Sequence, residues 1–460
     1  MDNYEKLRPV GLIEKYSTAR NHLGFYYNVV VAATYTLPAT FTLPIQDYIY
    51  KGCEVLIGQH PALSALPLGE DTNEPYWVRL PEVDLSQAVH FQKRTQPIPE
   101  TDKDTELEKL LQDQHNTPFM APHPYWRLCV LTDEIQPQRF TAAFVYHHAV
   151  GDGTSGKAFH ENLLPALRSA VSLAPGEAKQ IIPSPQSPLL PSLEEAHPLP
   201  ISFLYLITAL FKAKVWSPKN PRLWSGADMC QPLTTQVRYT VLPANLATSF
   251  RKICRQNNTT ITAALASLIA RAIFQHTPKN FTQVQASIPI AMRRWLPDNI
   301  TNKSIGVWVQ DCSESYDRNV VVTKDSSFPW DEAKRSRQSL EKALKLQGTD
   351  ADVGLLKYVD DFFEFFKSKV GKPRESSFEL SNVGPLVVEG AGDSAIPQIG
   401  HVVFSQCGSV TGSALEVSAV LGGDGCLSLA FSWQEGVVEA ELVTAVMETI
   451  RIDIHQVCAN

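Results

Sequence analysis

The stretch that decides the fold runs from residue 140 to residue 153 and reads FTAAFVYHHAVGDG. Its first part is almost entirely apolar, which predicts a strand that is buried on both faces. The strand leads directly into His147 and His148. The glycine-rich segment 151–153 then predicts a tight turn, and the apolar spacing after it predicts a helix. A side chain at the end of such a strand should lie at the mouth of a cleft on a rigid support.

His148 is the candidate catalytic residue of this stretch. An imidazole has an ordinary pKa close to neutrality, so it can remove a proton from a hydroxyl group. Asp152, across the glycine turn, can hold either the loop or the ring. A metal site shared by His147 and His148 is a weaker hypothesis, because consecutive residues of a strand point to opposite faces. His147 is therefore expected to be a packed, hydrogen-bonded neighbour, and no metal is predicted.

The composition is that of a globular protein. The chain has 460 residues, of which 44% are hydrophobic and 19% are charged, and this length suggests two or three domains. The net charge is −7 and no basic stripe is present, so nucleic acid is not an expected partner. The eight cysteines include no Cys-x-x-Cys pair, which argues against a zinc site or a disulfide framework. The first residues lack the apolar segment of a secretory signal, and a cytoplasmic location is expected.

Prolines crowd the segment between residues 174 and 225, and this marks the boundary between two lobes. We expect an N-terminal lobe over residues 1–175, a proline-rich crossover over 176–225 and a C-terminal lobe over 226–460. Both lobes mix predicted strands and helices, so the expected fold class is α/β with mixed sheets and a cleft between the lobes. The crossover holds one apolar helix near residues 201–211. It is too short to span a bilayer, and we expect it to pack on the protein rather than on a membrane surface.

The chain resembles a known family over nearly its whole length. It is similar to the fungal alcohol acetyltransferases, within the wider chloramphenicol-acetyltransferase-like fold that also includes plant BAHD acyltransferases and condensation domains of nonribosomal peptide synthesis. The motif at residues 147–153 is typical of the superfamily, whereas the flanking segments favour the alcohol acetyltransferase branch. These flanking segments are residues 8–16, 125–128, 259–265, 289–293 and 380–384. The Asp-Phe-Gly-Trp-Gly motif of the BAHD branch is absent, and its nearest counterpart is the Ser-Asn-Val-Gly at 381–384.

This resemblance implies two lobes with a tunnel between them. An acyl thioester, usually acetyl-coenzyme A, enters from one side as a co-substrate, and the acceptor alcohol enters from the other. No permanently bound cofactor is implied. His148, the second histidine of the motif, removes the hydroxyl proton, and the alkoxide attacks the thioester directly. Asp152 is expected to point away from the substrate and to pair with Arg293, while Gly153 and His147 support the loop. We expect a monomer without a transmembrane segment.

Other residues are candidates for contacts with the substrates. The oxyanion that develops during acyl transfer needs a hydrogen-bond donor. Ser381 and Asn382, at a strand end in the second lobe, are candidates for this role, and the alternative is that they only bridge the lobes. Arg293 and Arg294 could instead bind coenzyme A phosphates. The phenylalanines within 362–366 could line an acceptor tunnel, although packing between the lobes is the simpler explanation.

The leading functional hypothesis is transfer of an acyl group, expected to be acetyl, to a hydroxyl of a simple alcohol or a hydroxylated natural product. A condensation-type enzyme would instead take its acyl group from a carrier protein. The same pocket could also catalyse an elimination or a cyclisation. A purely binding role is the third alternative, but the intact set of His148, Asp152, Gly153 and Arg293 speaks against a decayed site.

Overall fold

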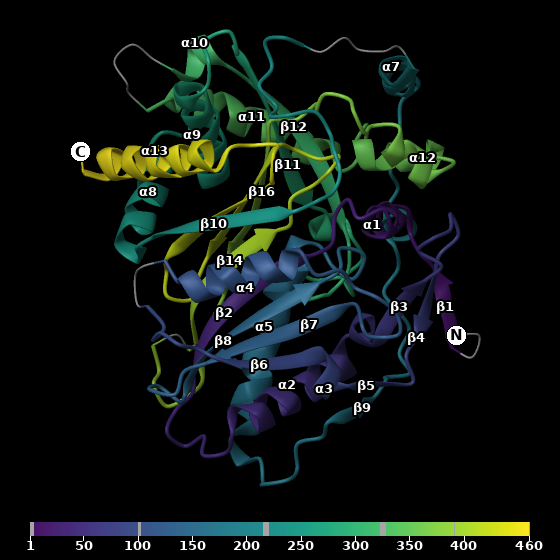
Figure 1. The fold of residues 1–460 in the computed structure, drawn as a ribbon, viewed down its shortest axis with the longest axis vertical. Coiled ribbons are helices and arrows are strands. Elements are labelled where there is room, and N and C mark those ends of the chain that lie inside the picture. Colours follow the sequence, from purple (N-terminus) through teal and green to yellow (C-terminus); the bar gives the residue numbers. More distant parts are fainter. Residues whose placement is uncertain (1–3, 100–102, 215–219, 323–327, 391, 460) are drawn as a thin grey trace.

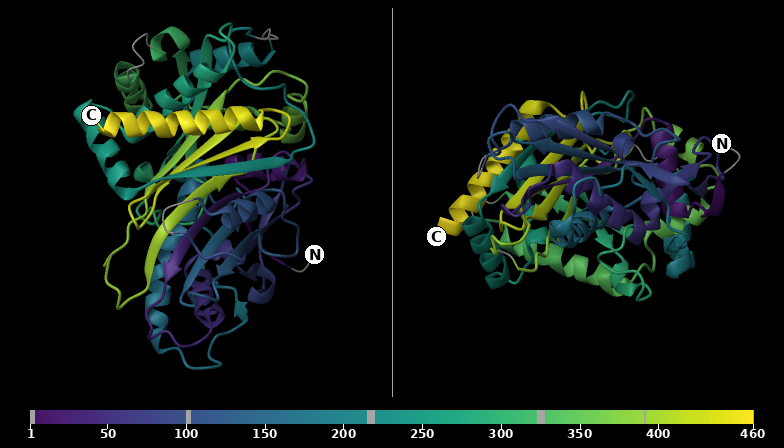
Figure 2. Two further views of the ribbon diagram at one scale, coloured as in Figure 1. Left: turned by 60° about the vertical axis from the view of Figure 1, so that its left-hand side comes forward. Right: turned by 90° about the horizontal axis from the view of Figure 1, so that it is seen from below.

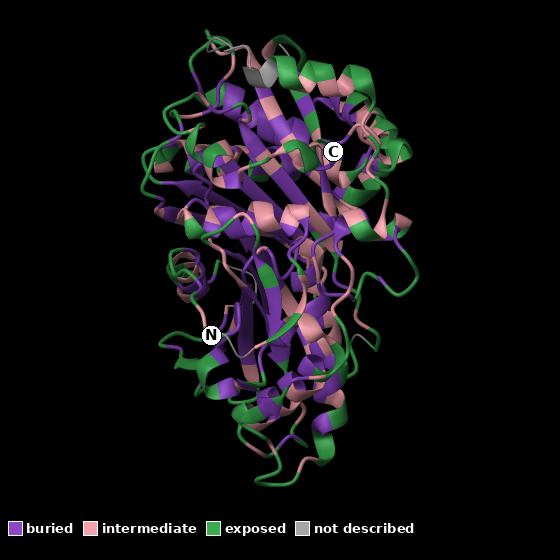
Figure 3. Cartoon of the chain, turned by 90° about the vertical axis from the view of Figure 1, so that its right-hand side faces the viewer, coloured by how far each residue is buried: buried purple, intermediate pink, exposed green. Residues whose placement is uncertain are grey.

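The structure, a computed structural model, describes residues 4–99, 103–214, 220–322, 328–390 and 392–459. Two large sheets dominate it, one in each half of the molecule (Figures 1 and 2). Each sheet has its own hydrophobic core. Most of the strand residues are buried, while the helices expose their outer faces to solvent (Figure 3). The predicted fold class, a mixed α/β protein with two lobes, is confirmed.

The N-terminal sheet has five strands in the order β14-β2-β8-β7-β6. These strands are β14 (Gln398–Gln406), β2 (Val29–Thr36), β8 (Arg139–Tyr146), β7 (Trp126–Thr132) and β6 (Val89–Lys93). Only β6 and β7 pair in parallel. The central strands β2 and β8 are apolar on both sides because α2 (Ile45–Gln59) and α5 (Gly153–Ser169) cover one face while α4 (Thr105–His115) lies between the other face and β10.

The C-terminal sheet has six strands in the order β10-β16-β15-β13-β11-β12. These strands are β10 (Thr235–Leu242), β16 (Leu427–Gln434), β15 (Leu415–Leu421), β13 (Phe378–Pro385), β11 (Gln283–Ala291) and β12 (Val309–Asp317). One face is apolar and carries the helices α8 (Ala244–Gln256), α9 (Ile261–His276), α11 (Trp330–Leu346) and α13 (Ala440–Ala459). The other face turns toward the N-terminal lobe (Figure 2).

Smaller elements connect and flank the two sheets. The short strands are β1 (Glu5–Pro9), β3 (Ala65–Leu68), β4 (Tyr76–Arg79), β5 (Glu82–Asp84) and β9 (Ile181–Pro183). The remaining α-helices are α1 (Leu12–His22), α3 (Leu85–Ala88), α6 (Leu193–Ala196), α7 (Phe203–Lys214), α10 (Arg318–Val321) and α12 (Phe362–Lys367). The 3-10 helices are η1 (Pro61–Ser64), η2 (Ala170–Ser172), η3 (Arg293–Trp295) and η4 (Asp352–Tyr358).

Strand β14 departs from the expected domain boundaries. Residues 226–460 were all expected in the second lobe, but β14 pairs antiparallel with β2 of the first lobe, with Val403 opposite Ala32. Its inner residues are apolar and buried, so pairing with β2 covers an apolar edge that would otherwise be exposed. The N-terminal sheet is therefore assembled from both ends of the chain.

Helix α7 corrects a second expectation, that the apolar helix of the crossover packs on the protein. The helix is present, at the upper right of Figure 1, but it is largely exposed. Phe203 is 77% exposed and Phe211 is 65% exposed. Polar contacts hold its first turn, since Tyr205 donates to Asp352 at 2.6 Å. Among the described residues, no helix combines the length and the apolar character needed to cross a membrane.

Candidate active site

Strand β8 ends in the two histidines of the motif, and their side chains have different surroundings. His147 is 1% exposed. Its Nδ1 accepts the main-chain N–H of Ala149 at 2.9 Å, and its Nε2 lies 3.2 Å from Glu70 Oε1. These contacts hold the turn that follows the strand. His147 is thus a packed neighbour whose Nδ1 is hydrogen-bonded and whose Nε2 lies close to a carboxylate of the N-terminal lobe.

His148 retains solvent-accessible surface although it lies deep between the lobes. Its ring centroid is 5.6 Å from that of Tyr26, and the Arg20 guanidinium lies 4.4 Å from the Tyr26 ring. Burial, followed by the positive charge of Arg20, lowers the pKa of His148 to about 4. The imidazole is therefore neutral at pH 7, which is the form that can accept a proton. Its Nδ1 has no hydrogen-bonding partner on any other described residue.

Asp152 caps the N-terminus of α5 and forms a buried, bidentate ion pair with Arg293. Arg293 Nη1 lies 2.7 Å from Asp152 Oδ2, and Arg293 Nη2 lies 2.9 Å from Oδ1. The main-chain N–H groups of Ser155 and Trp308 donate to the same carboxylate. Burial would raise the pKa of Asp152, but the charge and hydrogen bonds of Arg293 outweigh it and lower the pKa. The structure thus brings together the two residues that the resemblance had paired, and their contacts link the lobes.

The glycines after the motif allow α5 to approach its neighbours closely. A Cβ atom at Gly153 would lie 3.0 Å from Val383 Cγ1 and 3.1 Å from Phe404 Cζ. A Cβ atom at Gly156 would lie only 2.4 Å from Val31 Cγ2. Because Val383 belongs to the C-terminal sheet, the start of α5 lies at the seam between the lobes. Small residues are needed here for packing.

Ser381 and Asn382 lie on β13, and their described hydrogen bonds do not involve His148. Asn382 Nδ2 donates to Thr262 Oγ1 at 3.0 Å, and Asn382 Oδ1 accepts the N–H of Gly384 at 2.9 Å. Ser381 is 8% exposed. The amide of Asn382 is therefore used within the C-terminal lobe, and the oxyanion role of both residues stays a prediction.

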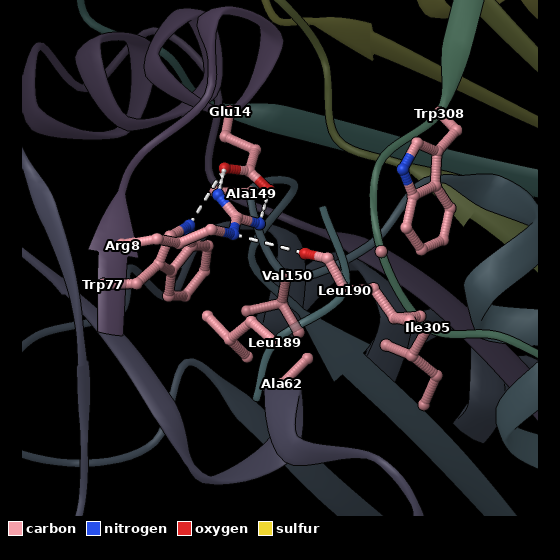
Figure 4. Close-up of a pocket in the computed structure, with 11 residues that line it drawn as sticks. Arg8, Glu14, Ala62, Trp77, Ala149, Val150, Leu189, Leu190, Ile305 and Trp308 are labelled. Atoms are coloured by element: carbon pink, nitrogen blue, oxygen red, sulfur yellow. Dashed lines mark hydrogen bonds and ion pairs between the residues drawn. The ribbon is translucent and has the colours of Figure 1, made fainter. Parts of the chain in front are cut away.

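A small cavity of about 20 Å³ lies behind the motif loop, against Ala149 and Val150 (Figure 4). Arg8 and Glu14 form a bidentate ion pair beside it, with both N···O distances at 2.8 Å. Trp77 Nε1 donates to the same carboxylate at 2.9 Å. A cavity of this size holds about one water molecule. It is too small for a substrate, and most of the residues that line it are apolar.

Comparison with known proteins places this geometry in a family. A sequence model described as alcohol acetyltransferase matches residues 99–449. The probable alcohol acetyltransferase crmB of Aspergillus fumigatus is 32% identical over 448 residues, covering 93% of this chain and 95% of that protein. The chain belongs to the alcohol acetyltransferase family. The probable alcohol acetyltransferase FCK4 of Fusarium pseudograminearum is 26% identical, covering 97% of this chain and 94% of that protein.

Solved structures support the same fold for this alcohol acetyltransferase family member. The TRI3 trichothecene 15-O-acetyltransferase of Fusarium sporotrichioides aligns with a TM-score of 0.76 at 14% identity, over 98% of this chain and 94% of that one. The first condensation domain of the calcium-dependent antibiotic synthetase aligns with a TM-score of 0.63 at 16% identity, over 98% and 97%. At these identities the likeness concerns the fold alone.

The cluster of His148, Asp152 and Arg293 does not include Arg294, the phenylalanines of α12 or His401. Arg294 is exposed and its guanidinium lies 5.4 Å from the Trp295 ring. The phenylalanines of α12 pack against the N-terminal lobe, with the Phe366 ring 4.8 Å from that of Tyr16. They therefore hold the lobes together. His401 lies on β14, where its Nδ1 is 3.4 Å from Asp424 Oδ2 at the hairpin turn.

Sequence reasoning missed Arg20 and Tyr26 as neighbours of His148. Arg20 lies between the rings of Tyr16 and Tyr26, 4.4 Å from each. The Tyr26 hydroxyl donates to Gln406 Oε1 at 3.4 Å, across a sequence separation of 380 residues. The only local signal was the spacing of Tyr16 and Arg20, which places them on one face of α1.

Proposed function

We propose that this protein transfers an acetyl group from acetyl-coenzyme A to a hydroxyl group of a small-molecule alcohol, with His148 as the general base. The observation that carries the proposal is a neutral, solvent-accessible imidazole at the lobe seam, on a loop held by the Asp152–Arg293 pair. Membership of the alcohol acetyltransferase family supports the reaction type. A hydroxylated natural product is the proposed acceptor.

The proposed reaction needs no covalent enzyme intermediate. His148 takes the proton from the acceptor hydroxyl as its oxygen attacks the thioester carbonyl carbon. The tetrahedral intermediate then collapses, the carbon–sulfur bond breaks, and the imidazolium returns its proton to the departing thiolate. The products are the acetate ester and free coenzyme A. A thioester is already activated, so positioning and a well-placed base supply much of the lowering of the barrier.

The role of His148 can be tested by following thiol release from acetyl-coenzyme A with a panel of alcohols. We expect His148→Ala to lower kcat/KM by roughly 10²–10⁴-fold, the usual contribution of a general base. His123→Ala is the matched control, because His123 is exposed. Unchanged turnover in His148→Ala would rule out this mechanism. Turnover only with an acylated carrier protein would favour a condensation-type reaction, and ligand binding without any turnover would favour a binding role.

A further inference from the structure

Three carboxyl side chains lie on the face of the C-terminal sheet that turns toward the N-terminal lobe. We call them the acidic cluster: Asp311 on β12, Glu379 on β13 and Glu416 on β15. Glu379 is directly opposite Glu416 in the parallel register of β13 and β15. The adjoining residues Leu380 and Val417 point the other way, into the apolar core beneath α9. The acidic cluster is therefore aimed between the lobes.

The acidic cluster is connected to the proposed catalytic base through Arg20 and Tyr26. Gln406 Nε2 donates to Glu379 Oε1 at 3.0 Å, and Gln406 Oε1 accepts the Tyr26 hydroxyl at 3.4 Å. The Tyr26 ring faces His148. The charge of Arg20 acts on both sides of this chain, since it lowers the pKa of His148 and opposes the rise in the pKa of Glu379. The acidic cluster and His148 thus border the same region between the lobes.

The acidic cluster forms no ion pair within the described part of the chain. Among the described residues, none of its three carboxyls has a cationic nitrogen within 4.0 Å. Arg374 and Arg20 are the cations that act on Glu416, and Arg374 donates its hydrogen bonds to Ser409 O, Gly412 O and Gln434 Oε1 instead. Burial and repulsion from Asp311 raise the pKa of Glu379 to about 7, while burial and repulsion from Asp352 raise the pKa of Asp311 to about 6. Burial and repulsion from Glu379 raise the pKa of Glu416 well above its ordinary value.

The strongest sign of a missing partner is Glu416 itself. This side chain belongs to a residue that is only 3% exposed, and its Oε2 has no hydrogen-bonding partner within the described part of the chain. The buried hydroxyl of Ser409 and the Nε of Arg20, which act near this carboxyl, lack partners among the described residues as well. Buried polar atoms are nearly always satisfied, so several unsatisfied atoms around one cluster indicate that a polar ligand or water belongs there. Glu379 and Asp311 keep accessible surface, which leaves a ligand a way in.

We propose that the acidic cluster binds a positively charged nitrogen of the acceptor, so that the preferred acceptor is an alcohol with a cationic group remote from the hydroxyl that is acylated. This inference rests on the proposed function, because it names the acceptor class of the same site. A cation bound between Glu379 and Glu416 would provide the positive charge that no described side chain places in contact with them. The outer acids Asp350 and Asp352, which hold Ser202 and Tyr205 at the start of α7, extend the negative potential outward.

The test uses two acceptors that differ only in charge. One is a linear alcohol that ends in a trimethylammonium group, which cannot itself be acylated, and the other is its neutral tert-butyl isostere. The ratio of their kcat/KM values in the thiol-release assay, measured for several chain lengths, is the readout. We expect the cation to be preferred by roughly tenfold or more in the wild-type protein. We expect this ratio to fall toward one in Glu379→Gln and Glu416→Gln but not in Glu435→Gln, where the glutamate is exposed.

Binding measured without catalysis separates this inference from the proposed function. In calorimetric titration with the trimethylammonium alcohol, we expect binding to release protons from the carboxyls, so that the measured heat changes with the ionisation enthalpy of the buffer. Glutamine preserves the shape of each side chain, and melting temperatures of the variants check that folding is retained. Equal use of both acceptors at every chain length, or a cation preference that survives both glutamine variants, would overturn the inference. If no alcohol is acetylated, the proposed function fails, and cation binding with proton release still decides the cation site by itself.

Discussion

Two groups of buried ionisable side chains lie between the lobes, and they differ in the partners that the protein gives them. Asp152 and Arg293 form a bidentate pair, and the remaining acceptor capacity of the carboxylate is filled by main-chain N–H groups. Glu379 and Glu416 face each other without a cation in contact. The Asp152–Arg293 pair holds the loop that follows β8. The carboxyls of Glu379 and Glu416 have no such partner among the described residues, and for this reason they are the proposed site for a cationic group. A cation in direct contact therefore distinguishes the paired group from the unpaired one.

The largest expected effect on stability comes from breaking the paired group. Asp152→Ala leaves the Arg293 charge buried and uncompensated, and removes the cap of α5. We expect the free energy of unfolding to fall by about 3–5 kcal/mol, measured by chemical denaturation. Asp424→Ala, at a partly exposed hairpin turn, is the comparison variant and should lose less. An Asp152→Ala protein of unchanged stability would mean that this pair does not hold the loop.

A smaller effect is expected from the close packing on the paired side. Gly156→Ala places a Cβ atom 2.4 Å from Val31 Cγ2, so α5 must shift away from β2. We expect a loss of roughly 1–3 kcal/mol, the usual cost of overpacking. Gly58→Ala is the control, since a Cβ atom there meets no other atom within 4 Å. Equal free energies of unfolding for both variants would show that α5 can shift away from β2 without loss of stability.

The smallest effect is expected from the unpaired side, and it depends on pH. The pKa of Glu379 is raised to about 7 in the folded protein, above the ordinary value of 4.5. Between these values the folded state binds more protons than the unfolded state, so stability falls as pH rises through this window. Glu379→Gln should flatten this slope and raise stability at pH 8, where the wild-type carboxyl is mostly ionised. Melting curves between pH 5 and pH 8 measure this, and an unchanged slope would contradict a raised pKa.

Much of the fold was predictable because it is encoded locally. The apolar run ending at His147, the glycine turn and the helix after it follow from residue periodicity alone, and β8 and α5 occur where they were expected. Arg293 was found through the resemblance, since no local pattern connects it to Asp152. The helical segments η4 and α12 are separate, because the Asp361 side chain caps a new helix by accepting N–H bonds from Phe363 and Glu364.

The parts that were missed depend on contacts between distant segments. The sequence of β14 specifies a strand but does not specify which sheet it joins. The surroundings of His148 include Arg20 from α1 and, through Tyr26, Gln406 from β14, and no spacing rule connects these positions. Helix α7 has the apolar composition of a buried helix, and only the structure shows that its large side chains face solvent.

The pairing of β14 with β2 limits where this chain can be divided. A cut within the proline-rich crossover would leave β2 with a bare apolar edge in one fragment and β14 as an orphan strand in the other. Exposed edges of this kind promote aggregation. Split reporters, separate expression of the halves and exchange of lobes between relatives should therefore carry residues 398–406 with the N-terminal fragment.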